Sequence, residues 1–343
     1  MTPPPLFPFT EYWWLYAVFT GGILGLLALD LGVFHRDARP VSVREAAGWS
    51  AVWISLALLF NVALYFYVGW VLGNGSRPGL DADDAAWQTA LEFLTGYLVE
   101  YSLSVDNIFV FVLVLRYFAV PAAHQHRVLF YGILGALIFR GVFIALGSVL
   151  MQFHWVVWLF GTFLIVTGIK MAMSSDATIE PDRNPLLRLL RRLLPVSKEF
   201  HGPHFLIRDG GRLIATPLLV ALCCLEATDI VFALDSVPAI FALTREPFIV
   251  FSSNVFAILG LRSLYFLLGD AVERFHLLRY GLAVVLVFVG LKMVWLDAWY
   301  GGKFPIGLSL GIIAGVLVAS IVASMVVSRR VGEPQARVGS GEA

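Results

Sequence analysis

The chain has 343 residues, of which 59% are hydrophobic and only 14% are charged, whereas soluble domains carry about 25% charged residues. Its 24 basic and 24 acidic residues cancel, so the net charge gives no reason to expect a nucleic-acid partner. The two cysteines are adjacent, at Cys223 and Cys224, which excludes a disulfide framework and a thiolate zinc cluster. The composition therefore indicates a polytopic membrane protein.

Nine apolar runs approach the length of roughly 20 residues that a membrane-crossing helix needs. They lie near 12–34, 49–73, 91–115, 128–150, 155–173, 214–241, 248–269, 280–297 and 306–328. We therefore expect an all-α fold with about nine transmembrane helices. The expected segments are an N-terminal helix pair (1–75), an outer loop (76–90), a first three-helix repeat (91–174), a cytoplasmic loop (175–212), a second three-helix repeat (213–297), a last helix (305–330) and a disordered cytoplasmic tail (331–343).

The placement of basic residues predicts which side of the membrane each loop faces. If the N-terminus lies outside, the outer segments contain only Arg77, Arg245 and Lys303, and the other loop arginines and lysines face inward. This bias predicts an N-out, C-in orientation. Leucines and arginines alternate in blocks over 184–195, which predicts a basic amphipathic helix on the inner leaflet. A solvated linker helix is the alternative for this segment.

The chain repeats itself. Glu100 and Asp106-Asn107 in the third apolar run match Asp229 and Asp235-Ser236 in the sixth, with the same separation between the two acids. The third and sixth runs are expected to cross the membrane in opposite directions, so the repeats are inverted, with three helices each. Inverted repeats recur in secondary transporters, which bind substrate at the repeat interface. A duplication with a purely structural role is the alternative. Further matches pair Arg140 with Arg262, Gly147 with Gly269, and 168–171 with 290–293.

Ionisable residues fall well inside the predicted spans. Each costs about 2.5–3.5 kcal/mol at a helix centre, so these side chains are expected to face one another or a polar cavity. Residues of this kind are candidates for function by default. They are Glu100, Asp106, Arg140, Glu226, Asp229, Asp235 and Arg262.

Carboxylate, amide and hydroxyl oxygens together predict a site for a hard cation. Such ligands suit Mg²⁺, Ca²⁺ or Mn²⁺ better than Cu⁺ or Zn²⁺. Pro238 is expected to disturb the helix after Ser236 and to free carbonyl oxygens near Asp235. Arg140 and Arg262 would either balance the acids when no cation is bound or join the repeats as static ion pairs, and both roles stay open. The predicted metal ligands are Asp106, Asn107, Glu100, Glu226, Asp229, Asp235 and Ser236.

Six segments carry recognisable motifs: 30–36, 92–97, 100–107, 125–130, 226–239 and 253–262. These motifs resemble those of the TerC family of integral membrane proteins, and within it the Alx-like members. The resemblance extends from about residue 10 to 330. It implies a metal-ion exporter of the bacterial cytoplasmic (inner) membrane, related to the lysine-exporter superfamily, with Mn²⁺ as the favoured substrate. It also implies that Asp106, Asn107, Asp229, Asp235 and Ser236 are ligands, with Glu100 and Glu226 nearby.

The leading hypothesis is a secondary transporter that exports divalent metal ions, with proton exchange as the natural coupling. The family that the motifs resemble was named for tellurium resistance. The alternative is therefore a membrane scaffold or assembly factor with an indirect role in tellurite or ion-stress resistance. An enzyme is not expected, because the chain has no Walker-type loop, Gly-x-Ser-x-Gly elbow or His-Glu-x-x-His motif. We expect no cofactor, since Mn²⁺ would be the transported ion. The expected partners are that divalent ion and the lipid bilayer, without nucleic acid, and a homo-oligomer is left open.

Overall fold

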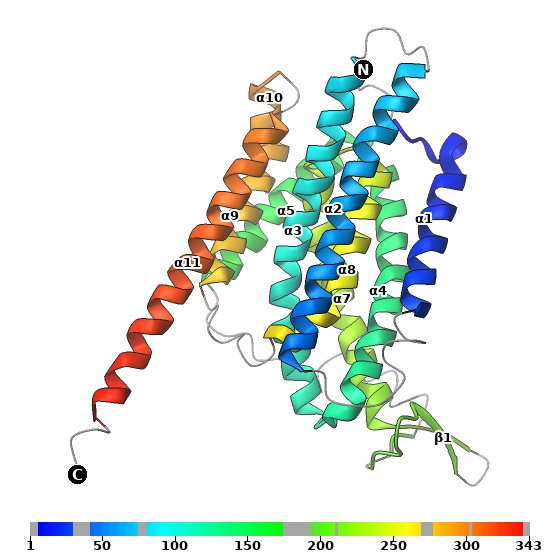
Figure 1. Ribbon diagram of the computed structural model, residues 1–343, viewed down its shortest axis with the longest axis vertical. Helices are drawn as coiled ribbons and strands as arrows, with labels where there is room; N and C mark the ends of the chain where they lie inside the picture. Colours follow the sequence, from blue (N-terminus) through cyan, green and yellow to red (C-terminus); the bar gives the residue numbers. More distant parts are fainter. Residues whose placement is uncertain are drawn as a thin grey trace.

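A computed structural model describes residues 6–29, 42–74, 81–173, 192, 195–197, 199–209, 212–268, 277–301 and 304–338. Within these residues the chain is a bundle of long helices with a small β-hairpin at one end (Figure 1). The motif at 30–36 lies outside the described residues, and so does almost all of the amphipathic helix predicted at 184–195.

Nine helices of the described residues are long and apolar enough to cross a membrane, which confirms the predicted all-α polytopic fold. Helix α9 continues through a π-helical turn, Lys292–Leu296, into the short helix α10, Asp297–Trp299. The last helix extends to Val338, into the segment expected as a disordered tail. The nine are α1 (Phe9–Leu29), α2 (Val43–Asn74), α3 (Ala82–Tyr117), α4 (Ala122–Leu150), α5 (His154–Met173), α7 (Pro217–Phe241), α8 (Pro247–Leu268), α9 (Leu278–Leu291) taken together with its continuation to Trp299, and α11 (Ile306–Val338).

Local sequence accounts for several helix boundaries. The Asp81 side chain caps α3 by accepting a hydrogen bond from the Asp83 N–H at 3.0 Å, the interaction that makes aspartate a favourable N-cap. Pro217 and Pro247 begin α7 and α8, where the missing N–H of proline leaves no helix bond unmade. Pro238 lies inside α7, but the helix continues through it to Phe241. The prediction that the helix is disturbed after Ser236 is therefore wrong. The missing N–H of Pro238 still leaves one carbonyl oxygen of the preceding turn without its helix partner, so the freed carbonyl oxygen near Asp235 stays a prediction.

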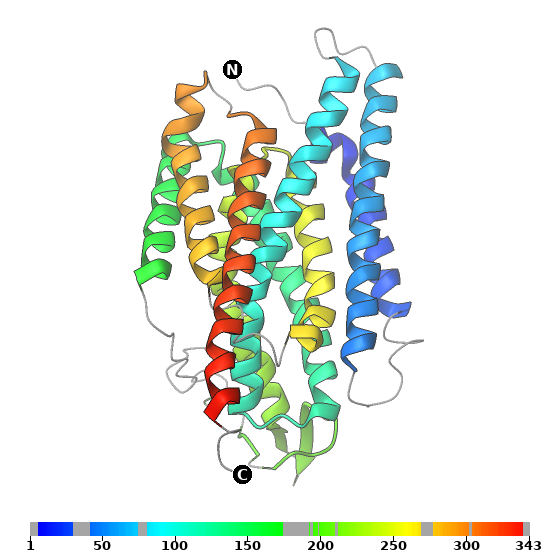
Figure 2. The same cartoon turned by 60° about the vertical axis from the view of Figure 1, so that its left-hand side comes forward.

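Helix α8 lies at the centre of the bundle and packs against α2, α3 and α4 (Figures 1 and 2). Of the nine candidate spans it is the most buried, since 94% of its apolar window lies inside the protein. A side chain added at Gly96 of α3 would lie 3.0 Å from Ser253 Oγ, so these two helices approach closely. Because its neighbours shield α8 from lipid, it tolerates buried polar residues such as Ser252, Ser253 and Asn254.

Helices α5 and α9 meet through glycines. A Cβ added at Gly161 would lie 3.1 Å from the Gly290 carbonyl oxygen, and one added at Gly168 would lie 2.7 Å from the Ala283 carbonyl oxygen. In the sequence repeat, Gly161 aligns with Ala283 and Gly168 with Gly290, so the alignment exchanges one contact for the other. It likewise exchanges the packing of α3 on α8 for that of α4 on α7. A two-fold relation between the repeats would generate these pairs, and the inverted orientation stays a prediction.

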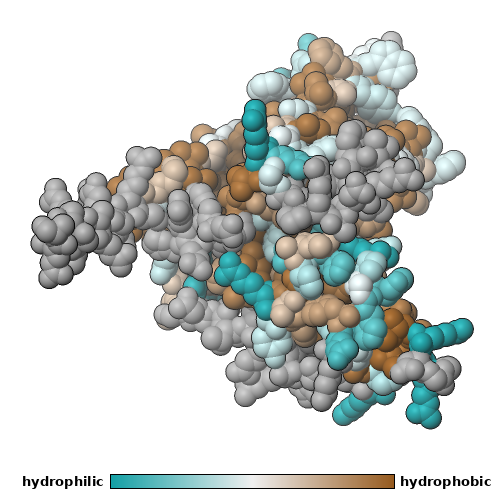
Figure 3. Space-filling view, turned by 60° about the horizontal axis from the view of Figure 1, so that its bottom comes forward, coloured by the Kyte–Doolittle hydropathy of each residue, from teal (hydrophilic) through white to brown (hydrophobic). Residues whose placement is uncertain are grey.

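A β-hairpin of β1 (Leu206–Asp209) and β2 (Arg212–Ala215) marks one end of the bundle. Thr216 Oγ1 donates to the His204 carbonyl at 2.7 Å, and the Phe205 ring packs edge-on against Tyr131 at 5.1 Å between centroids, so the hairpin is attached to α7 and α4. The sequence did not predict these strands. Figure 3 shows hydrophilic side chains gathered over this end, which we call the hairpin end. In the predicted orientation it faces the cytoplasm.

Candidate functional site

Arg140 of α4 lies at the centre of a buried polar cluster, with only 2% of the residue exposed. Its Nη1 donates to Asn254 Oδ1 at 2.7 Å and to Ser236 Oγ at 3.0 Å. Its Nη2 donates to Asp229 Oδ1 at 3.3 Å, and an ion pair joins the guanidinium to Glu100. We call these five residues the Arg140 cluster. It connects α3 and α4 of the first predicted repeat with α7 and α8 of the second.

The Arg140 cluster has more negative charge and more acceptor atoms than Arg140 satisfies. Glu100 and Asp229 each carry a negative charge when ionised, against the single positive charge of Arg140. Glu100 Oε2, Asp229 Oδ2 and Arg140 Nε are buried without a hydrogen-bond partner. Buried polar atoms in native proteins are almost always paired with protein or ordered water, so these atoms are open to a water molecule, a ligand or an ion. The excess negative charge and the unpaired carboxylate oxygens of the cluster could therefore bind an additional cation or protons.

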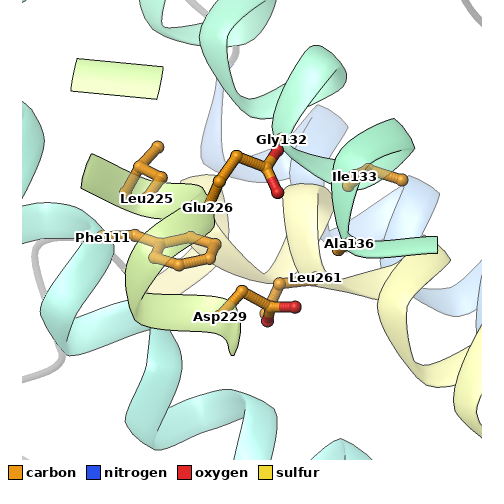
Figure 4. A pocket seen from close by; sticks show the side chains of 8 residues that line it. All are labelled: Phe111, Gly132, Ile133, Ala136, Leu225, Glu226, Asp229 and Leu261. Atoms are coloured by element: carbon orange, nitrogen blue, oxygen red, sulfur yellow. The ribbon is translucent and has the colours of Figure 1, made fainter. Parts of the chain in front are cut away.

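A small cavity adjoins the cluster on the side of the hairpin end. Its volume of about 10 Å³ is close to the minimum that one water molecule requires. The Glu226 and Asp229 side chains extend from α7 toward it (Figure 4). Glu226 Oε2 and Asp229 Oδ2 are both buried without a hydrogen-bond partner. The cavity is lined by Phe111, Gly132, Ile133, Ala136, Leu225, Glu226, Asp229 and Leu261.

Glycines of α4 make room for Glu226. A Cβ added at Gly135 would overlap the Glu226 carboxylate, whereas one added at Gly132 would meet its nearest neighbours at 3.9 and 4.0 Å, an ordinary contact distance. The position of the Glu226 carboxylate therefore depends on the absence of a side chain at Gly135. The sequence alone did not identify Gly135 as important, because the sequence around a glycine in an apolar span does not show which residue packs against it.

The remaining predicted ligands do not join the Arg140 cluster. Asp235 is half-buried on α7 and interacts with Thr167 of α5. Six residues separate it from Asp229, which places it about 120° away around the helix. Asn107 is buried in α3 at 3% exposure, and the side chain of Asp106 lies outside what the structure describes. Within the described residues, no three His, Cys, Asp or Glu side chains lie close enough to hold a metal ion.

Asn254 is the cluster residue that the sequence reading missed as a candidate ligand. A search for ionisable groups overlooks it because an amide carries no charge. The available signal was the run of three consecutive polar residues, Ser252-Ser253-Asn254, inside a predicted membrane span. Arg262 lies eight residues beyond Asn254 on α8 and is also buried, at 7% exposure, about 12 Å along the helix axis toward the hairpin end.

Comparisons with known proteins agree with a membrane protein of this kind. A family model described as "Integral membrane protein TerC family" matches residues 85–332. The Myxococcus xanthus "Uncharacterized membrane protein STKORF319" is 51% identical over 284 residues, which cover 82% of this chain and 84% of that protein. The "Putative membrane-bound redox modulator Alx" of Escherichia coli (strain K12) is 47% identical over 287 residues, which cover 83% and 86% of the two chains. No solved structure matches the chain.

Proposed function

Because the chain belongs to the TerC family of integral membrane proteins, we propose that it is a secondary transporter that exports divalent metal ions, with Mn²⁺ as its favoured substrate. We place it in the cytoplasmic membrane of a bacterium. The observation that carries the proposal is the Arg140 cluster, in which a buried cationic side chain joins acids from both repeats while two carboxylate oxygens stay unpaired.

In the proposed mechanism Arg140 neutralises the acids of the site when no transported ion is bound. Its guanidinium occupies the position between Glu100 and Asp229 where a cation would be most stable. Removing one partner from a buried ion pair costs about 3–5 kcal/mol, so the acids need a positive charge whenever they are ionised. A metal ion would take over this role and release Arg140. The cluster then has two states, and the binding of the ion biases the equilibrium between them.

The charge of the site favours a cation over an oxyanion. Glu226 adds a third carboxylate next to Asp229, and these acids would repel tellurite. Oxygen ligands suit Mn²⁺, Mg²⁺ or Ca²⁺. The same carboxylates can bind protons when the metal leaves, which makes proton exchange the simplest coupling. Tellurite resistance would then be an indirect result of ion homeostasis.

A redox activity is the second candidate, because relatives carry the name redox modulator. The described residues offer little for dithiol chemistry. Cys223 and Cys224 are free and consecutive on α7, and successive side chains on a helix point about 100° apart. Cys224 is also buried. These facts favour metal export as the direct activity, and a scaffold role remains the alternative without transport.

The test is the manganese content of bacterial cells exposed to excess Mn²⁺, measured by elemental analysis together with calcium. The strains carry no copy of the protein, the wild type, Asp229→Asn, or Glu11→Gln, which removes an exposed acid of α1 as a matched control. We expect the wild type and Glu11→Gln to lower cellular manganese and Asp229→Asn to fail at equal membrane abundance. Unchanged manganese in every strain would overturn export and leave the scaffold alternative. A selective fall in calcium would keep the transporter and replace its substrate.

A further inference from the structure

The turn between α7 and α8 is held by buried side chains at the end of the bundle opposite the hairpin. Thr244 Oγ1 donates to Glu92 Oε2 of α3 at 2.5 Å. Lys292, the first residue of the π-helical turn that continues α9, donates from Nζ to the Ala242 carbonyl at 2.5 Å. Glu92, Thr244 and Lys292 are 5%, 2% and 2% exposed. We call these three residues the latch, because they fasten the C-terminal end of α7 to α3 and α9.

Further contacts tie the latch to its surroundings. Lys292 forms an ion pair with Asp297 at 3.3 Å, and Asp297 Oδ1 accepts a hydrogen bond from the Phe304 N–H at 2.9 Å. Lys292 also begins the π-helical turn of α9, a feature found often at functional sites. Two residues beyond Thr244, Glu246 accepts a hydrogen bond from the Leu6 N–H at 2.7 Å. The segment before α1 and the start of α11 are therefore fastened to the same end.

The repeat shows that the two ends of the bundle are built differently. Glu92 aligns with Ala221 and Thr244 with Leu115, and both of these are buried in one apolar cluster near the hairpin end. Lys292 aligns with Lys170, which is exposed. The three residues of the latch form buried polar bonds. Of their equivalents at the hairpin end, two are apolar and buried, and the third is a lysine whose side chain is exposed.

We infer that Glu92, Thr244 and Lys292 form the gate that controls opening of the ion pathway at the end opposite the hairpin, an inference that rests on the proposed transport function. The cavity beside Glu226 lies on the hairpin side of the Arg140 cluster. Toward the latch, Glu92 lies eight residues before Glu100 on α3, about 12 Å of helix. Thr244 lies eight residues after Ser236, in the turn that follows the end of α7 at Phe241. Transporters with inverted repeats expose a fixed site to one side at a time by moving one half against the other. Moving α7 away from α3 and α9 at this end requires breaking both bonds of the latch.

The gate can be tested by labelling a residue that lies between the cluster and the latch. Ile240 is fully buried on α7, and Ile240→Cys is made in a full-length chain whose own cysteines are replaced by alanine. A membrane-impermeant maleimide is added to intact cells and, separately, to inside-out vesicles. Arg245→Cys, at an exposed position of the same turn, shows which preparation presents the latch end to the reagent.

The latch is then weakened by Thr244→Val, with Lys292→Met as a second variant that removes the other bond. Thr89→Val is the matched control, because Thr89 is a buried threonine of α3 whose hydroxyl bonds only to its own helix. We expect each latch variant to speed labelling of the Ile240→Cys thiol about tenfold, the factor that corresponds to loss of one charge-assisted hydrogen bond. Thr89→Val should leave the rate unchanged.

The gate would be overturned if the latch variants labelled the Ile240→Cys thiol no faster than the unmodified latch does. It would also be overturned if Thr89→Val increased the labelling rate as much as the latch variants do. Mn²⁺ flux measured in the same vesicles separates this result from the proposed function. Faster labelling without any wild-type Mn²⁺ flux supports an opening at the latch and contradicts metal transport. Flux with unchanged labelling supports transport and contradicts the gate.

Discussion

The Arg140 cluster and the latch are both buried and polar, but they differ in how completely their atoms are paired. In the cluster, Glu100 Oε2, Asp229 Oδ2 and Arg140 Nε are buried without hydrogen-bond partners. Within the described part of the chain, no side-chain nitrogen or oxygen of the latch is buried without a hydrogen-bond partner. Unpaired buried polar atoms are costly, so the atoms of the cluster favour an added partner such as water, a proton or a cation. If the proposed function is correct, we expect the cluster to exchange partners and the latch to hold helices together.

The largest effect is expected for Arg140→Gln, which removes the central cation of the cluster. Loss of one partner from a buried ion pair should lower the free energy of unfolding by about 3–5 kcal/mol, because Glu100 and Asp229 are left facing each other. Mn²⁺ should restore more stability to this variant than it adds to the wild type, since the metal ion takes the place of the guanidinium. Thermal unfolding in detergent, with and without Mn²⁺, measures both effects. Arg245→Gln, at an exposed arginine, is the control, and equal stabilisation of all three proteins would contradict the exchange.

Asn254→Ala should have a smaller effect on the same cluster. It removes the 2.7 Å hydrogen bond from Arg140 Nη1, and hydrogen bonds to charged groups contribute about 1.5–3 kcal/mol. Ser252→Ala is the matched control, because the Ser252 hydroxyl donates only to the Ile249 carbonyl of its own helix. The free energies of unfolding of the two variants are compared with that of the wild type. If Ser252→Ala lost as much stability as Asn254→Ala, the bond to Arg140 would have no special weight.

Gly135→Ala tests the position of the Glu226 carboxylate rather than the stability of the bundle. The added methyl group would overlap this carboxylate and displace it from the cavity. We expect Mn²⁺ flux into proteoliposomes to fall about tenfold, the factor given by about 1.4 kcal/mol of lost binding free energy. Gly132→Ala, whose methyl group would make ordinary contacts at 3.9 and 4.0 Å, should transport normally. Equal fluxes in the two variants would show that Glu226 does not act in the cavity.

The smallest effect is expected when Cys223 and Cys224 are both replaced by alanine. These residues pack in an apolar cluster and belong to neither polar network, so Mn²⁺ flux should change by less than about threefold. Flux is measured before and after treatment with a thiol oxidant. Inhibition of the wild type by the oxidant, with resistance in the double variant, would support the redox alternative.

The apolar runs predicted the number and type of the membrane helices, because the length of a hydrophobic run is a local property of the sequence. The acid pairs predicted which helices meet, and Glu100 and Asp229 do lie on either side of one arginine. The sequence could not show that Arg140 occupies the centre of the cluster, or that Asp235 turns toward α5, because both depend on the rotation of packed helices. Asp229 and Asp235 are only six residues apart, so the sequence suggests that they share one site. On the helix this separation places them on different sides. The roles of Gly135 and Thr244 could not be predicted either, because they depend on Glu226 and Glu92, which face them from other helices.

The most direct test of the central claim is Mn²⁺ binding to the purified full-length protein in lipid nanodiscs, followed by the loss of the EPR signal of aqueous Mn²⁺. The wild type and the Thr89→Val control should each bind the ion, and Asp229→Asn should bind it at least about tenfold more weakly, since the loss of one charged ligand exceeds about 1.4 kcal/mol. Equal binding by all three proteins, or none by the wild type, would contradict a cation site at the Arg140 cluster.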